Sequence, residues 1–551
     1  MAPSRGRLIF LIGLLVALTA LVIVQLVRYQ VLLQIPAGDA GPQLIPSEPV
    51  RRGWFYDRNG FVLAADEPRY MVLYDRNGGD SDRAARDLTP VIGLTPDKFR
   101  ELIGGGLVQT RLARDLSSEA GKRVRALDIA GVTAQAYWKR VYPENTLAAH
   151  VLGFVNEDRT GYYGLEGQYD GLLNGTTLRT DIPEVRPGAD LVLTLDRTVQ
   201  AITEEELARG LQDTGATSGS IIVMNPRTGE VLAMASAPTF NPNQYADLAK
   251  TDINQFINPA VSANFEPGST FKILTMAAAL DMGLVTPETI YNDTTYIEIG
   301  GQVIWNWDRA AHGETDMVGL LAKSLNVGAA TLAMQLGQQN FYRYVRAFGI
   351  GRPTGIDLQA EAAGQLRTRD TDPGNWSESD LGTNSFGQGV SATPIQMIAA
   401  VAAVANDGVL VQPHLVKKII NGTNETVAKT VQVGRPISAK TARTLTDMLV
   451  QAVDREVPFA QVPGYRVAGK TGTAQIPVPG GYDDPWTIAS FIGYAPADNP
   501  QLIIMVKLDR PTLSPYGSET AAPVFQKLAT RLFAVLDIKP DDIQLTLNNA
   551  Q

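Results

Sequence analysis

Ser269 and Lys272 are the two residues of this sequence whose types and spacing best fit covalent chemistry. Pro267 and Gly268 precede the pair and an apolar run of helix formers follows it, which predicts the first turn of a buried helix. Residues three positions apart share a helix face, so the serine hydroxyl and the lysine amine can meet. A desolvated lysine can take the proton of a serine nucleophile. The pair therefore predicts a serine nucleophile with a lysine base.

Two further runs strengthen this interpretation. Lys470-Thr471-Gly472-Thr473 lies in a β-patterned stretch, and its small residues would let a ligand pair with the strand edge, backbone to backbone. The Lys470 ammonium and the Thr471 hydroxyl suit a carboxylate of that ligand. The other run is Ser324-Leu325-Asn326, which is weak alone because Ser-x-Asn also occurs at 262–264, in an expected loop.

The composition argues against several other kinds of site. The chain has 551 residues and no cysteine, which excludes disulfides, thiolate metal sites and a cysteine nucleophile. Its three histidines, His150, His312 and His414, lie in different segments, which disfavours a Ser-His-Asp triad or a histidine metal site. We therefore expect no metal and no cofactor. The net charge of −9, without a long basic run, argues against a nucleic-acid partner.

The first residues read as a membrane anchor. An apolar run over 8–28 matches the thickness of a bilayer core, and Arg5 and Arg7 precede it. The positive-inside rule then leaves 1–7 as a cytoplasmic tail and exports everything after the helix. The alternative is a cleaved signal peptide, whose apolar core is normally shorter. Residues 29–49 are rich in proline and glycine and read as a stalk.

The segment after the stalk contains patterns that predict secondary structure but no residues that indicate a catalytic site. Asn59-Gly60 between apolar-aromatic runs predicts a β-hairpin. Residues 80–145 read as short helices alternating with loops. Residues 161–170 read as a packed glycine-rich turn, in which Glu166 is expected to form a structural ion pair rather than to act in catalysis.

A denser domain begins near residue 190. We expect a helix over 199–211 capped by Asp196 or Thr198, a mostly helical stretch over 265–455, and a last amphipathic helix over 521–536. Two β-patterned runs come early and three come late, which suggests one antiparallel sheet closed by distant parts of the chain. These runs are 219–224, 230–236, 465–476, 486–495 and 502–508.

The ordered trio of Ser-x-x-Lys, Ser-x-Asn and Lys-Thr-Gly resembles the penicillin-recognising serine acyltransferases. Further blocks resemble their transpeptidase domain, and the Arg-Gly…Asp-Arg-Asn-Gly and Gly-Leu-Glu segments resemble the non-catalytic pedestal of class B penicillin-binding proteins. The stretch between anchor and catalytic domain is too short for the glycosyltransferase of class A members. The transpeptidase-like blocks are 266–272, 387–389, 391–394, 406–408, 413–414 and 491–496.

The resemblance implies an α/β (α+β) fold. A transpeptidase domain over 190–537, with a five-stranded antiparallel sheet and a helical subdomain, would follow a β-rich elongated pedestal over 50–185. A polar tail over 538–551 would end the chain.

The resemblance also implies a mechanism. Ser269 would attack the carbonyl between the two D-alanines of a peptidoglycan stem peptide, with Lys272 as base; burial and the nearby Lys470 would lower the pKa of that base. Ser324 would relay a proton to the leaving D-alanine, and Asn326 would hold the substrate backbone or Lys272. The backbone N–H groups of Ser269 and Thr473 would form the oxyanion hole, and Thr471, Gly472 and Thr473 would bind substrate.

The implied partners are stem peptides, β-lactams that acylate Ser269, and a membrane-embedded glycosyltransferase. The run 326–328 resembles division-specific members more than elongation-specific ones. Three alternatives stay open: a β-lactamase, a D,D-carboxypeptidase, and a non-enzymatic sensor or scaffold. Trp305, Trp307 and His312 are expected to pack in a loop, with a place in the cleft as the alternative.

Overall fold

The computed structural model describes residues 50–178 and 184–541. Within these residues no helix has both the length and the apolar composition that crossing a membrane requires. The predicted cytoplasmic tail, anchor and stalk, and all but the first residues of the polar tail, lie outside the described residues.

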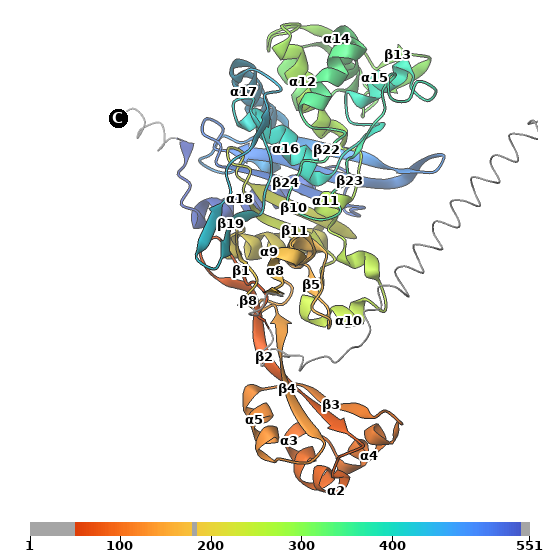
Figure 1. The fold of residues 1–551 in the computed structure, drawn as a ribbon. Coiled ribbons are helices and arrows are strands. Elements are labelled where there is room, and N and C mark those ends of the chain that lie inside the picture. The colour runs from red at the N-terminus through yellow and green to blue at the C-terminus, as the bar shows by residue number, and fades with distance from the viewer. Residues whose placement is uncertain (1–49, 179–183, 542–551) are drawn as a thin grey trace, which may run out of the picture. The chain divides into compact units, whose positions relative to one another are not determined.

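A five-stranded antiparallel sheet forms the centre of the fold (Figure 1), in the order β11-β10-β24-β23-β22. Distant parts of the chain meet in it, as predicted: two strands come from the early runs and three from the late ones. β22 lies at an edge, paired on one side only. The strands are β10 (Ser218–Met224), β11 (Val231–Ala237), β22 (Ala468–Val478), β23 (Gly481–Ala495) and β24 (Leu502–Asp509).

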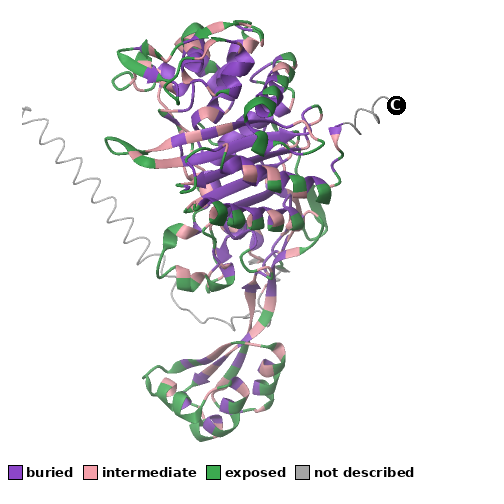
Figure 2. Ribbon diagram, turned by 180° about the vertical axis from the view of Figure 1, so that it is seen from behind, coloured by how far each residue is buried: buried purple, intermediate pink, exposed green. Residues whose placement is uncertain are grey.

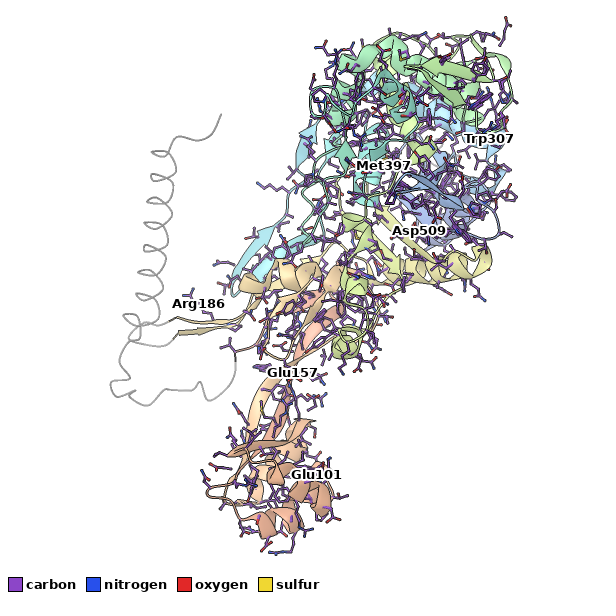
Figure 3. The ribbon with its side chains drawn as sticks, turned by 90° about the vertical axis from the view of Figure 1, so that its right-hand side faces the viewer. Glu101, Glu157, Arg186, Trp307, Met397 and Asp509 are labelled. Atoms are coloured by element: carbon purple, nitrogen blue, oxygen red, sulfur yellow. The ribbon has the colours of Figure 1, made fainter. Side chains whose placement is uncertain are left out.

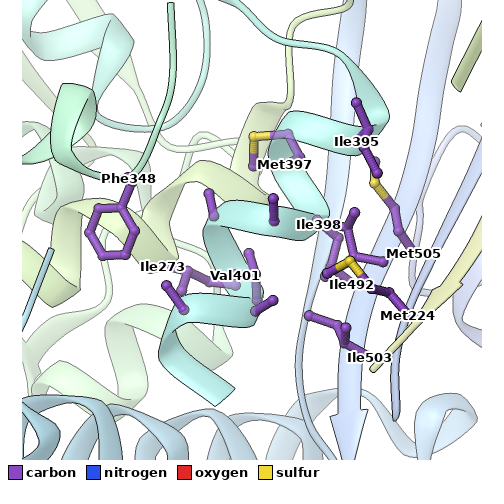
Figure 4. Packing of buried hydrophobic residues seen from close by; sticks show 14 of the residues in the cluster. Met224, Ile273, Phe348, Ile395, Met397, Ile398, Val401, Ile492, Ile503 and Met505 are labelled. Atoms are coloured by element: carbon purple, nitrogen blue, oxygen red, sulfur yellow. The ribbon is translucent and has the colours of Figure 1, made fainter. Parts of the chain in front are cut away.

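Helices cover both faces of this sheet, so its strands are buried on both sides (Figure 2). Successive side chains of a strand point to opposite faces, and β24 follows this rule. Ile503 and Met505 pack in the core with α12 and α16 (Figure 4), whereas Ile504 and Val506 pack in the core with α9 and α18. These helices are α9 (Arg197–Thr214), α12 (Lys272–Asp281), α16 (Pro394–Ala405) and α18 (Ala521–Val535).

The sequence signals for α9 and α18 are confirmed. The Asp196 side chain caps α9 by accepting the backbone N–H of Thr198 at 2.9 Å and of Val199 at 3.1 Å. Gly215 ends the helix with a φ of 67°, a left-handed conformation that favours glycine.

The middle of the chain is helical, as predicted, but short strand pairs interrupt it. Its longest helix, α14, contains a non-helical residue at Gly337. Besides α12 and α16, its helices are α13 (Met317–Ala322), α14 (Asn326–Ala347), α15 (Glu378–Asn384) and α17 (Ala439–Glu456). The paired strands are β12 (Tyr291–Asp293) with β15 (Gly313–Thr315), β13 (Tyr296–Ile299) with β14 (Gln302–Trp305), β16 (Gln365–Leu366) with β17 (Val390–Ser391), and β18 (Leu410–Val411) with β21 (Gln432–Gly434).

A second sheet joins strands from both halves of the chain, in the order β20-β19-β9-β1-β2-β3, with β4 also pairing with β2. The predicted hairpin at Asn59-Gly60 is confirmed, because β1 and β2 pair antiparallel around it. The strands are β1 (Phe55–Tyr56), β2 (Val62–Asp75), β3 (Gln109–Leu116), β4 (Val132–Val141), β9 (Asp190–Leu193), β19 (Val416–Asn421) and β20 (Asn424–Val427).

The interpretation of residues 80–145 as short helices and loops was wrong in part. β3 and β4 lie in this stretch and pair with both sides of β2. Both strands are half exposed and carry charged residues among the apolar ones, so pairing with β2 rather than a local apolar pattern defines them. The helices of this stretch are α2 (Ser81–Arg83), α3 (Thr89–Ile92), α4 (Pro96–Gly104), α5 (Ser118–Ala126) and the π-helical turn η2 (Ala84–Leu88), of which α4 and α5 contact β3.

Glu166 forms the expected ion pair, at the centre of a buried network. It lies on the short helix α7 (Gly164–Gln168) and is fully buried. Arg52 Nε donates to its Oε2 at 2.7 Å, Arg140 Nε donates to its Oε1 at 2.6 Å, and the Tyr142 hydroxyl donates to Oε1 at 3.2 Å. The network therefore ties segments on either side of residue 100 to one carboxylate.

Candidate active site

Ser269 lies in the 3₁₀ turn η5 (Gly268–Phe271), which leads directly into α12. Gly268 has a φ of 57°, and a Cβ at this position would lie 2.8 Å from the carbonyl oxygen of Thr473. Only glycine therefore permits this turn to approach β22 so closely. The predicted helical turn is present, in its tighter 3₁₀ form, and it holds the half-buried Ser269 beside the strand.

The buried Lys272 amine lies among four oxygen atoms. Its Nζ is 3.1 Å from Ser269 Oγ, 2.8 Å from Asn326 Oδ1, 2.5 Å from the Ser324 carbonyl oxygen and 3.2 Å from Ser324 Oγ. The carbonyl and amide oxygens can only accept hydrogen bonds, so they take two N–H donors. A neutral amine then has its lone pair free for the hydroxyl proton of Ser269.

The surroundings of Lys272 favour that neutral form. Burial lowers its pKa well below the usual lysine value, the positive charge of Lys470 lowers it further, and Asp293 opposes these effects. The amine also lies 5.9 Å from the centroid of the Phe386 ring. A base that is neutral near neutral pH is what proton abstraction from serine requires.

Ser324 connects the two lysines. It lies between α13 and α14 with a φ of 58°. Lys470 Nζ donates to its Oγ at 3.0 Å and lies 3.3 Å from the Thr471 hydroxyl. Burial lowers the pKa of Lys470 to about 7. Because Ser324 Oγ accepts this hydrogen bond from Lys470, its own proton is free to point into the cleft.

The edge strand β22 forms one wall of a cleft of about 680 Å³. Thr471, Thr473 and Gln475 line the cleft, whereas the alternate residues Lys470 and Gly472 are buried. A Cβ on Gly472 would lie 2.3 Å from Ser490 Oγ. The small residue thus allows β22 to fit between β23 and the serine turn.

The structure brings together all eight residues that the sequence singled out. Ser269, Ser324, Asn326, Thr471 and Thr473 line the cleft, Lys272 and Lys470 contact them from behind, and Gly472 packs below. Among the described residues, no group of three or more histidine, aspartate or glutamate side chains could hold a metal ion.

Two tryptophans expected in a loop also line the cleft. Trp305 and Trp307 both lie on it, and the Trp307 ring meets the Tyr516 ring edge-on, with 5.6 Å between centroids. Trp307 lies where the helical region meets the sheet (Figure 3). His312 instead contacts Asp308, at 2.9 Å.

Other residues of the site carried no sequence signal. Tyr516, Phe386 and Asn306 line the cleft from distant parts of the chain, and Asp293 lies behind Asn306. Each is a single side chain in a short strand or loop, and nothing in its local sequence marks the contact.

Comparison with known proteins places this geometry in a family. Residues 219–530 match the model of the penicillin-binding protein transpeptidase domain, and residues 47–185 match the penicillin-binding protein dimerisation domain.

Relatives and a solved structure match nearly the whole chain. Stage V sporulation protein D of Bacillus subtilis is 34% identical, and the match covers 98% of this chain and 87% of the relative. The probable peptidoglycan D,D-transpeptidase PenA of Neisseria gonorrhoeae is 30% identical, and the match covers 98% of this chain and 94% of the relative. The crystal structure of penicillin-binding protein 3 from Mycobacterium tuberculosis with aztreonam superposes with a TM-score of 0.72. Its sequence is 31% identical, and the match covers 90% of this chain and 98% of that chain. The chain belongs to the class B penicillin-binding proteins, the peptidoglycan D,D-transpeptidases.

Proposed function

We propose that Ser269 is the nucleophile of the D,D-transpeptidase reaction and that Lys272 is its base. This assignment rests on the contact between Lys272 Nζ and Ser269 Oγ. The two N–H groups of the neutral amine donate to the Ser324 carbonyl oxygen and to Asn326 Oδ1, which leaves its lone pair for the Ser269 proton. The hydroxyl proton passes to the amine as the serine oxygen attacks the carbonyl carbon between the two D-alanines. The resulting intermediate collapses to an ester on Ser269 and releases D-alanine.

The neighbouring residues complete the reaction. The proton that Lys272 took from Ser269 passes to Ser324 Oγ, 3.2 Å away, as the Ser324 hydroxyl proton passes to the departing D-alanine nitrogen. Asn326 orients Lys272, and Lys470 keeps Ser324 in place. The backbone N–H groups of Ser269 and Thr473 bind the developing oxyanion, a contribution of roughly 3 kcal/mol per donor in other enzymes. A neighbouring amine then attacks the ester, which forms the cross-link and frees Ser269.

The substrate is a stem peptide that lies along the free edge of β22. An unpaired strand edge accepts an extended peptide as an additional strand. Thr471, Gly472 and Thr473 form this binding edge, and the Thr471 hydroxyl beside Lys470 suits the terminal carboxylate. β-Lactams acylate Ser269 in place of the peptide, as the aztreonam complex of the mycobacterial relative supports.

The protein works on the outer face of a bacterial cell membrane. A single anchor over 8–28 follows a cytoplasmic tail over 1–7, and a stalk over 29–49 precedes a pedestal over 50–185 and a catalytic domain over 190–537. A membrane-embedded glycosyltransferase is the natural partner, because cross-linking requires polymerised glycan strands.

The experiment incubates the full chain with a stem pentapeptide donor and an amine acceptor. We expect a cross-linked product that a Lys272→Ala variant makes about 10³-fold more slowly, the typical contribution of a general base. Lys527→Ala, at an exposed ion pair, is the matched control. Full activity of a folded Lys272→Ala variant would contradict the base assignment. D-Alanine release without a cross-linked product would favour a carboxypeptidase.

A further inference from the structure

Asp293 is a buried carboxylate close to the reacting residues that has no role in the steps above. It ends β12 and is 1% exposed. Its Oδ1 accepts the Tyr291 hydroxyl at 2.9 Å, and its Oδ2 accepts the Asn306 amide at 2.7 Å and the His312 backbone N–H at 3.2 Å. Among the described residues no lysine, arginine or histidine side chain forms an ion pair with it, although burying a charge without a counter-charge is costly.

Asn306, its principal partner, is also 1% exposed, and every polar atom of its side chain is used. Besides Asp293, its Nδ2 lies 3.1 Å from the carbonyl oxygens of Thr294 and Ala310. Its Oδ1 accepts the backbone N–H of Asn326 at 3.0 Å and of Val327 at 3.1 Å.

These two N–H groups are the first of α14. A helix leaves its first N–H groups without partners, and a side chain at the N-cap normally accepts from them. The N-cap residue here is Leu325, which makes no such hydrogen bond. Asn306 therefore caps α14 from another element, and Asp293 and the two carbonyls hold Asn306 in the orientation that does so.

The capped residue is the one that touches the base. The Asn326 side chain places Oδ1 2.8 Å from Lys272 Nζ and anchors its Nδ2 on the Trp305 carbonyl oxygen at 3.0 Å. Both the backbone and the side chain of Asn326 are thus tied to residues 305–306. A continuous line of hydrogen bonds runs from Asp293 through Asn306 and Asn326 to Lys272.

We propose that Asp293 and Asn306 are positioning residues for acylation, which hold the start of α14, and with it Asn326, in the place that points the Lys272 lone pair at Ser269. This inference rests on the proposed role of Lys272 as base. A misplacement of about 1 Å at a reacting group can cost about 100-fold in rate.

Asp293 also acts on Lys272 through its charge. The groups around the Lys272 amine are Ser269, Ser324, Asn326, the Phe386 ring and Lys470. Asp293 raises the pKa of Lys272, against the lowering effects of burial and Lys470. Replacing this carboxylate by a neutral amide would lower the pKa of Lys272 further, so the base would stay neutral at a lower pH.

The test measures acylation of the full chain by a fluorescent penicillin, with the rate of the covalent step separated from the affinity of the initial complex. In Asn306→Ala we expect the covalent step to slow by about 100-fold. The initial affinity should be unchanged, because Asn306 is 1% exposed and its side-chain hydrogen bonds are all made within the protein. Ser438→Ala is the matched control: it removes a helix cap of similar kind from α17, which carries none of the eight site residues. We expect it to lower thermal stability and leave the acylation rate unchanged.

The Asp293→Asn variant tests the effect of the Asp293 charge through the pH dependence of acylation, which does not depend on the stability of α14. The substitution is isosteric and keeps an oxygen for the Asn306 amide, so the variant should fold. We expect the acidic limb of its acylation rate, plotted against pH, to move to lower pH than in the wild type.

The inference is overturned if Asn306→Ala, once folded, acylates within about threefold of the wild type or slows no more than Ser438→Ala. If Asn306→Ala does not fold, an unmoved acidic limb in Asp293→Asn overturns it. A wild-type chain that is not acylated would instead contradict the proposed function itself, so the two failures are distinguishable.

Discussion

At the scale of single residues, the site contains two lysines, Lys272 and Lys470, whose pKa values are lowered by burial. Lys470 is 3% exposed, and its pKa of about 7 is far below the usual lysine value of 10.5 because of that burial. Its amine contacts the hydroxyl groups of Ser324 and Thr471 in the site. We therefore expect the buried Lys470 amine to lower the free energy of unfolding.

Lys470→Met makes this cost measurable. Between pH 7 and 10.5 the unfolded chain keeps the lysine proton and the folded chain does not, so the wild type gains stability as pH rises. The variant lacks this gain. We expect Lys470→Met to be more stable than the wild type at pH 7, and expect this advantage to be smaller at pH 10 by up to about 4 kcal/mol, the free energy that a shift of this size carries. Urea unfolding at several pH values measures it, and a pH-independent difference would contradict the assignment.

At the scale of elements, the contact of the serine turn with β22 assembles the site. Gly268→Ala should break this contact, because the added methyl meets the Thr473 carbonyl oxygen at 2.8 Å in a backbone with positive φ. We expect acylation by penicillin to slow at least about tenfold and the free energy of unfolding to fall by about 1–2 kcal/mol.

Gly283→Ala separates these two effects. Gly283 has a φ of 67°, but nothing lies within 4 Å of an added Cβ, so only backbone strain is introduced. We expect it to lose stability of about 1 kcal/mol and to keep the wild-type acylation rate. Equal rates in the two glycine variants would mean that the close approach to β22 is not required.

The elements differ in how well the sequence predicts them. β10, β11 and β24 are buried apolar runs between turn signals, so their local pattern suffices. The prediction of β23 began at residue 486 and missed its exposed, polar start at 481–485. β3 and β4 escaped prediction because their exposed, charged faces leave no such run, and their position depends on pairing with β2.

The same distinction applies to the site. Ser269, Lys272 and the Lys470–Thr473 run were predictable because each has a distinctive local spacing. Asn306 and Asp293 were not, because a lone amide or carboxylate acquires its role only through partners that the fold brings to it.

At the scale of the whole molecule, buried charge joins distant segments. Glu166 binds Arg52, which precedes β1, and Arg140, which lies on β4. Removing one partner of a buried ion pair leaves the others uncompensated, so we expect Glu166→Ala to lower the free energy of unfolding by about 3–5 kcal/mol. The folded fraction should still be acylated by penicillin at the wild-type rate.

Glu205→Ala is the control for charge loss alone. Glu205 also pairs with two arginines, Arg209 and Arg531, but at the surface, where solvent screens the interaction. We expect little change in its urea unfolding curve. Similar curves for the two variants would show that the Glu166 network does not stabilise the fold.

The most direct test of the account is intact-protein mass spectrometry of the full chain after incubation with penicillin. We expect one added penicillin on the wild type, mapped to the peptide that contains Ser269, and none on Ser269→Ala. A long-lived adduct would also argue against a β-lactamase. An adduct that persists in Ser269→Ala, or no adduct on a folded wild-type chain, would contradict the assignment of Ser269 as the nucleophile.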